Sequence, residues 1–284
     1  MTDRRLSIHF FSGVAWTLLV VATFASTARA DDAIADEARP EQTASLRVQD
    51  DIVRMSRRPA VLPQGTASAS TAIGWESEFE PSTTWTMGIE LAATDWLAAY
   101  VSPATVRVDE AEFGTTQLGL RARYPIGKME LVGEARVAIN GDGVVMLTPS
   151  TTFVLHHSTM FRLDAGLAPT FTFDGGRGIM ALANLATPSR LMPGLPLSFW
   201  FSPASSFSFC IWTGLGATNV EAFESTGYVG LGSTWVATIE HEGKPLIDLR
   251  VDTGHPRLHH FDSPWPLFTV FEITGGVASH VDLF

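Results

Sequence analysis

The sequence predicts an all-β fold, an antiparallel up-and-down transmembrane β-barrel of about 12 strands with a short N-terminal periplasmic tail. Three observations predict it. The first thirty residues resemble a secretory signal, no later apolar run approaches the roughly 18 residues that a membrane helix needs, and apolar and polar residues alternate from about Ser68 onward. Only a closed barrel lets strands satisfy all their backbone groups inside hydrocarbon.

The export signal occupies residues 1–30. Arg4 and Arg5 precede an apolar stretch at residues 14–25, and residues 28–30 (Ala-Arg-Ala) form a small-residue cleavage site. A membrane anchor is the alternative, but the apolar stretch is short for a bilayer span and Arg29 follows it closely. We therefore expect a cleavable signal peptide, and export to the cell outer membrane of a Gram-negative bacterium.

The composition of the chain limits the kinds of binding partner that we expect. The net charge is −11, and removal of residues 1–30 with their three arginines and one aspartate makes it −13, which argues against nucleic acid as a partner. Cys210 is the only cysteine, so no intrachain disulfide can form. We expect no cofactor.

Two regions follow the signal. Residues 31–67 are acidic at first, then mixed, and lack a two-residue period, so we expect a periplasmic tail or, if this stretch folds inward, a plug segment. Residues 68–284 keep one texture of Val, Ile, Thr, Phe and Trp, broken at clusters of Gly, Pro, Asn and Asp. This texture predicts one outer-membrane β-barrel domain.

Tight connections between the expected strands alternate with mostly longer ones, as in barrels with short periplasmic turns and long extracellular loops. An even number of strands places both termini in the periplasm. The expected strands are 68–79, 84–92, 95–101, 115–124, 128–139, 144–156, 159–173, 194–202, 206–216, 227–239, 244–252 and 267–281. Aromatic residues lie near tight turns, as an interfacial girdle would place them: Trp96, Tyr124, Phe161, Trp200 and Phe207.

Each strand has one apolar and one charged face. Leu118 and Leu120 share one face of strand 115–124, for example, and Arg121 and Arg123 share the other. Alternation alone also fits a soluble barrel or sandwich with the charges outside. The signal and the aromatic placement favour charges inside, as do small residues on the charged faces: Gly119, Gly166, Gly230 and Gly232.

With the charged faces inward, a set of carboxylates and arginines lines the lumen. Its members are Glu76, Glu78, Glu90, Arg121, Arg123, Glu130, Glu134, Arg136, Arg162, Asp164, Asp248, Arg250, Asp252 and Glu272. Neighbouring rows would pair across strands. The pairs either fill and rigidify a narrow barrel, or line a mildly cation-preferring or small-solute pore in which the acidic excess sets the field.

The C-terminal Phe284 adds a resemblance to known proteins. With the alternating strands, this terminal aromatic residue makes the chain similar to bacterial outer-membrane β-barrel proteins of porin-like or transporter-like type. The resemblance implies contact with outer-membrane lipid and recognition of the last strand by the barrel assembly machinery. The sequence departs from the usual pattern at His280 and Asp282, which stand where apolar residues are expected. Residues 58–65 (RPAVLPQG) resemble the stretch before the first strand of some uncharacterised transporter-like barrels, and also fit a turn.

Two histidine groups are candidate chemical sites. The first group lies in an expected loop at residues 253–266, matches no defined metal-ligand pattern, and comprises His255, His259 and His260. In the second, His156 and His157 precede Ser158 without the oriented third group that nucleophilic catalysis needs, and no Gly-x-Ser-x-Gly motif occurs. We therefore assign no metal ligand and no catalytic residue.

The function predicted from the sequence is a narrow channel or transporter-like barrel for small solutes. The apolar-rich loop at residues 179–195 could form a constriction or a site for a hydrophobic solute, or else an extra strand or short helix on the rim. One alternative function is a structural or adhesive barrel with a closed lumen and partner-binding loops. A less favoured alternative is an outer-membrane hydrolase.

Overall fold

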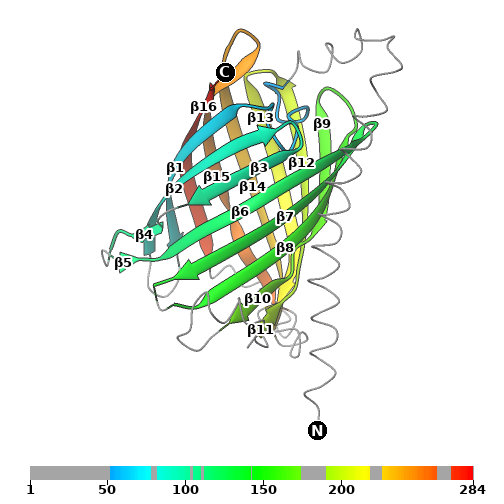
Figure 1. The fold of residues 1–284 in the computed structure, drawn as a ribbon. Helices are drawn as coiled ribbons and strands as arrows, with labels where there is room; N and C mark the ends of the chain where they lie inside the picture. The colour runs from blue at the N-terminus through cyan, green and yellow to red at the C-terminus, as the bar shows by residue number, and fades with distance from the viewer. Residues whose placement is uncertain are drawn as a thin grey trace. The chain divides into compact units, whose positions relative to one another are not determined.

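Twelve antiparallel strands pair in a closed ring in the computed structural model (Figure 1). The structure describes residues 52–77, 82–102, 105–109, 112–141, 143–173, 190–217, 226–260 and 270–283, without the side chains of residues 112, 113, 259 and 260. The ring runs β1-β16-β15-β14-β13-β12-β9-β8-β7-β6-β3-β2, and β2 pairs with β1 again. Because every strand has two partners, the barrel has no open edge. The predicted fold class is confirmed.

The twelve strands follow the expected segments closely. They are β1 (Thr66–Ser77), β2 (Ser82–Thr94), β3 (Leu97–Ser102), β6 (Thr115–Ile126), β7 (Met129–Asn140), β8 (Val145–His156), β9 (Phe161–Leu167), β12 (Gly194–Ala204), β13 (Phe207–Ala217), β14 (Gly227–His241), β15 (Lys244–His260) and β16 (Phe271–Asp282). β1 therefore begins two residues earlier than expected.

Four short strands extend the wall: β4 (Thr105–Arg107), β5 (Glu112–Phe113), β10 (Thr170–Phe173) and β11 (Arg190–Met192). β10 pairs with β11 and with β8, so part of the apolar-rich stretch expected as a loop is strand on the rim. Residues 179–189 of that stretch lie outside the described residues, as do the signal at 1–30, Glu78 and Phe284. None of the described segments is a helix long and apolar enough for a bilayer span.

The loop predicted at residues 253–266 was wrong in its first half, because β15 continues to His260. Its partner β14 pairs with it as far as Tyr228, across an irregularity between Val229 and Leu231. Pro256, which cannot donate a backbone hydrogen bond, falls in this irregularity, so a ladder that the sequence appears to break continues past it. Among described residues no group of three or more His, Cys, Asp or Glu is placed to hold a metal ion.

Five tight turns, the start of β1 and the end of β16 gather at one end of the barrel, here called the tight-turn end; the opposite end is the long-loop end. At the β14–β15 turn, Glu242 and Gly243 have φ of 53° and 77°, as a two-residue type I′ hairpin requires. The start of β1 meets the end of β16 there, since the Leu283 N–H donates to the Gly65 carbonyl at 2.9 Å.

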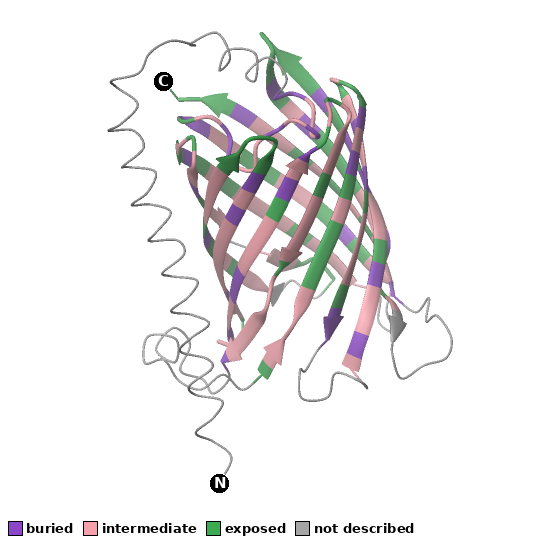
Figure 2. Ribbon diagram, turned by 90° about the vertical axis from the view of Figure 1, so that its right-hand side faces the viewer, coloured by how far each residue is buried: buried purple, intermediate pink, exposed green. Residues whose placement is uncertain are grey.

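The outer face of the barrel is apolar. Exposed and less exposed residues alternate along the strands (Figure 2), and large apolar side chains such as Ile73, Leu120 and Phe153 are 59%, 55% and 57% exposed. The charged residues of the same strands point the other way and pair with one another inside. A soluble barrel or sandwich would bury the apolar face instead, so charges lie inside and apolar residues outside.

Outer aromatic clusters lie near the tight turns. The rings of Phe161 and Phe201 are stacked 5.1 Å apart with Phe199 alongside, and Phe207 and Phe209 contact Trp235. The prediction was wrong for Trp200. Its side chain alternates with Phe199 and Phe201, is 8% exposed, and packs against Cys210 on the inner face.

Candidate functional site in the barrel interior

Residues 52–65, here called the inner segment, run inside the barrel at the tight-turn end, where Figure 1 shows the start of the described chain among the strands. The segment contacts side chains or backbone of β2, β3, β7, β8, β9, β12, β13, β14 and β15. A segment can reach strands all around a ring only from within it. Residues 31–67 were expected as a periplasmic tail or a plug, and within this region the inner segment folds inward.

Ser56 anchors the inner segment to β12, to β8 and to the turn between β8 and β9. Its N–H donates to Ser202 Oγ at 3.1 Å, and its hydroxyl donates to the Thr159 carbonyl at 2.7 Å. Its carbonyl meets His156 Nδ1 at 2.8 Å. Ser56 and Ser202 are both fully buried, so these bonds satisfy polar groups that water does not reach.

The Arg58 side chain binds both the barrel wall and the backbone of its own segment. Its guanidinium forms an ion pair with Asp248, with a second contact of 3.2 Å from Nη2 to Oδ1, and the two side chains are only 8% and 10% exposed. Nε donates to the Ile52 carbonyl at 3.1 Å and Nη2 to the Val53 carbonyl at 3.0 Å. One side chain therefore closes a loop in the segment and fixes it to β15.

Asp248 extends this network across the barrel seam, the junction of β1 and β16. Thr238 donates to Asp248 Oδ1 at 2.7 Å, and His280 Nε2 lies 2.9 Å from Oδ2. The other ring nitrogen of His280, Nδ1, lies 2.7 Å from Ser68 Oγ. An ionised carboxylate can only accept hydrogen bonds. A neutral His280 therefore donates a hydrogen bond to Asp248 from Nε2 and accepts one from the Ser68 hydroxyl at Nδ1.

Glu130 holds the other side of the inner segment. It accepts the Ala60 N–H at 3.0 Å, is ion-paired with Arg123 at 3.1 Å, and lies 3.3 Å from His156 Nε2. Arg162, which forms an ion pair with Asp164, also donates hydrogen bonds to two backbone carbonyls of the inner segment, at 3.0 and 3.3 Å. Side chains of the wall thus bind the backbone of the segment directly.

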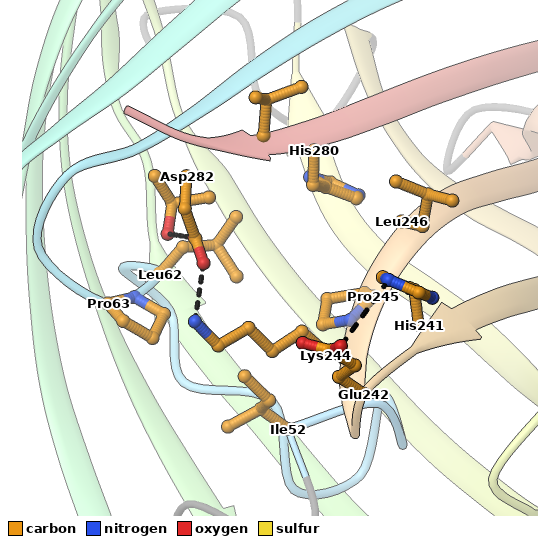
Figure 3. Close-up of a pocket in the computed structure, with 12 residues that line it drawn as sticks. Ile52, Leu62, Pro63, His241, Glu242, Lys244, Pro245, Leu246, His280 and Asp282 are labelled. Carbon is orange, nitrogen blue, oxygen red and sulfur yellow. Dashed lines mark hydrogen bonds and ion pairs between the residues drawn. The ribbon is translucent and has the colours of Figure 1, made fainter. Parts of the chain in front are cut away.

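The end of the inner segment packs through apolar contacts. Val61 and Leu62 are buried against Ala92 and Ala98, whose small side chains leave room on the inner wall. Beside them a cavity of about 220 Å³ opens between the segment, the β14–β15 turn and the last strand. Figure 3 shows Ile52, Leu62 and the exposed Lys244–Asp282 ion pair among the residues that line it.

Above the inner segment, toward the long-loop end, Arg121 organises a charged cluster. Its Nε lies 2.9 Å from Glu134 and its Nη1 3.3 Å from Glu90, and the Tyr100 hydroxyl donates to Glu134 at 2.8 Å. Gly119 makes this arrangement feasible, because a Cβ there would lie 2.2 Å from the Tyr100 ring. A cavity of about 510 Å³ lies between this cluster and the segment.

The opposite wall carries a second charged pair beside two tryptophans. Arg250 binds Asp252 through Nε and Nη2 at 2.7 and 2.8 Å, and Thr234 also donates to Asp252. Together with Trp200 and Trp212 these residues border a cavity of about 460 Å³.

Arg136, Glu76 and Glu272 complete the described part of the residue set predicted for the lumen. Arg136 lies on the same face of β7 as Glu134 and has no hydrogen bond or ion pair among the described residues. Glu76 on β1 stands directly opposite Glu272 on β16.

The inner segment changes the net charge of the barrel interior. The wall set has eight described carboxylates and five arginines, and the segment brings Arg54, Arg57 and Arg58. With these three arginines the acidic excess disappears.

Sequence reasoning missed the buried network around Arg58, Ser68 and His280. Asp248 was expected only as a wall charge, and its partners lie far away in the chain. The available signal was the break in the C-terminal pattern: His280 is buried and faces inward, whereas Val281 and Leu283 are 55% and 54% exposed. His156, considered only beside Ser158, instead binds the inner segment.

Comparison with known proteins places the fold. No family model and no curated protein sequence matches the chain. Among solved structures, the NanC porin aligns with a TM-score of 0.56 at 8% identity and the KdgM porin with 0.53 at 7%, each over 74% of this chain and 98% of the porin. An outer membrane channel from Pseudomonas putida F1 aligns with 0.53 at 11% identity, over 78% of this chain and 99% of the channel. The chain has the fold of outer-membrane β-barrel channels.

Proposed function

We propose that the protein is an outer-membrane barrel that passes small solutes through a narrow lumen, and that the inner segment closes its periplasmic, tight-turn end. In this proposal the signal peptide is cleaved, the apolar outer face contacts lipid, and the barrel assembly machinery binds the last strand. The observation that carries the proposal is the interior itself, in which charged side chains border cavities of up to about 510 Å³ inside a closed ring. The porin-like fold supports it.

The inner segment supplies the reason for a closed state. Its backbone and Arg58 bind residues around the wall, so solute could not pass the tight-turn end while these contacts hold. Apart from the apolar packing of Val61 and Leu62, the contacts are polar, and all of them are confined to one short segment. Exchange of the segment's hydrogen bonds for water would open the path without unpairing any strand of the barrel.

Planar-bilayer conductance tests the proposal. The full-length refolded protein should open rarely, and a variant lacking residues 52–62 should conduct more and for longer. Lys244→Ala, which breaks an exposed ion pair at the same end, is the control and should behave as the wild type. If the deletion variant folds and forms no channels above background, the lumen is closed by its own side chains, and the alternative of a structural or adhesive barrel is favoured.

A second candidate function is ester hydrolysis at Ser68, favoured by one observation. Ser68, His280 and Asp248 form a hydrogen-bonded chain in the order nucleophile, base and orienting carboxylate, and both Ser68 and His280 border the cavity of about 510 Å³. A fluorophosphonate probe should then label the wild type and leave Ser68→Ala unlabelled. Equal labelling of the two proteins would exclude this function and leave the chain as a purely structural tie across the seam.

A further inference from the structure

Trp212 lies on the inner wall of the barrel, against the two strands that follow its own strand around the ring. It faces the interior from β13, and its row across the sheet continues with Gly232 on β14 and Gly254 on β15. A Cβ on Gly232 would lie 2.1 Å from Trp212 Cζ2, and one on Gly254 would lie 2.6 Å from the same atom. The indole therefore reaches across two strands and rests on the backbone of both glycines.

Trp212 also packs against the cluster of Trp200, Cys210 and Val236, and it is only partly buried. Trp212 borders two cavities, of about 460 and 370 Å³. Trp200 also borders the larger one and is 8% exposed. An aromatic surface beside polar side chains in one cavity is the combination that suits a polar ligand with an apolar face.

The polar groups around this surface are hydroxyls and one neutralised ion pair. Ser198, Thr234 and Thr274 line the larger cavity, along with Arg250 and Asp252. The bidentate contact between Arg250 and Asp252 cancels their charges, yet Arg250 remains 53% exposed toward the lumen and keeps guanidinium N–H groups available to a ligand. The site therefore offers donors and acceptors without net charge.

We infer that Trp212, Trp200 and the Arg250–Asp252 pair form a binding site for an uncharged sugar ring. The C–H face of a pyranose packs on an indole, and its hydroxyls can both donate and accept, as the neighbouring groups require. A carboxylated sugar finds no free cation here, because Asp252 occupies Arg250. This inference deepens the proposed function by naming the class of solute, and it rests on solutes entering the lumen.

Calorimetric titration of the refolded protein in detergent tests the site without any transport. The probes are three uncharged trisaccharides, maltotriose, cellotriose and galactotriose, with trigalacturonate as the charged comparison. At least one uncharged probe should bind with saturation and more tightly than trigalacturonate. Trp212→Leu should weaken it roughly tenfold, whereas Trp235→Leu, which removes an outward-facing tryptophan, should not. Heat-modifiable migration in gels verifies that each variant is folded.

Asp252→Asn keeps the test decisive if Trp212→Leu does not fold. This variant frees Arg250, so the affinity for trigalacturonate should rise relative to that for the uncharged probes. Absence of binding by every uncharged probe, or tighter binding of trigalacturonate by the wild type, would overturn the inference. The outcome is separable from the conductance result: channels without sugar binding refute only the site, and sugar binding without channels refutes only the proposed transport.

Discussion

Arg58 and Asp248, separated by 190 positions in the chain, form a buried ion pair that fixes the inner segment to the barrel wall. Removal of one partner from such a pair leaves an uncompensated charge in a site that water reaches poorly. Without Arg58, the partners of Asp248 among the described residues are Thr238 and His280.

Arg58→Ala should therefore lower the free energy of unfolding by about 3–5 kcal/mol. Urea unfolding in detergent, followed by tryptophan fluorescence, measures it. Lys244→Ala removes an exposed ion pair with Asp282 and should cost no more than about 1 kcal/mol. Equal losses in the two variants would show that the Arg58 pair does not stabilise the barrel.

Gly119→Ala should displace Tyr100 from Glu134. A methyl group at this position would overlap the tyrosine ring, and overpacking of this kind costs about 1–3 kcal/mol. Gly275→Ala is the matched control, since no atom lies within 4 Å of the added methyl group. The unfolding midpoints of the two variants decide the matter, and the prediction fails if Gly119→Ala is as stable as Gly275→Ala.

Leu120→Arg tests whether the apolar face contacts lipid. Leu120 lies in the middle of β6 and is 55% exposed, so an arginine there should destabilise a barrel folded in phospholipid vesicles by about 2–4 kcal/mol. Val108→Arg, at a position 53% exposed but outside the strands of the ring, should have little effect. A soluble barrel would tolerate both substitutions equally.

The arginines of the inner segment should set ion selectivity. Replacement of Arg54, Arg57 and Arg58 by glutamine restores the excess of wall carboxylates, so the open channel should favour cations more than the wild type does. Reversal potentials across a potassium chloride gradient give the sign. Lys244→Gln, at the exposed ion pair near the turn, should leave the potential unchanged. A shift toward anions in the triple variant would contradict this account.

Periodicity was sufficient to predict the strands but not the inner segment. Alternation along residues 115–124 identifies a strand and its two faces from local information, because side chains of a strand alternate strictly. Residues 52–65 have no period, and their conformation depends on partners such as Glu130 and Asp248 that only the closed ring brings together. Two prolines and three arginines in a short stretch fit a turn as well as they fit a plug.

The errors within the barrel have local causes. The expected strand ended at residue 252, but Gly254 pairs in register with Gly232, and Pro256 falls at an irregularity beyond it. Trp200 was assigned to the girdle by its nearness to a turn, although its parity with Ser202 and Ser198 places it inside. The packing of Trp212 on the inner wall could not be recognised from the sequence, because it depends on Gly232 and Gly254, which lie beside it only in the folded sheet.

The network of Arg58, Asp248 and His280 also sets the order of events in assembly. Arg58 is synthesised early, whereas Asp248 and His280 belong to the last two strands, so the pocket for its guanidinium does not exist until those strands have joined β1. The inner segment can be fastened only in a finished barrel. A chain truncated before β15 would keep both an unpaired strand edge and a loose N-terminal segment, which leaves incomplete molecules open to proteolysis while finished ones are protected.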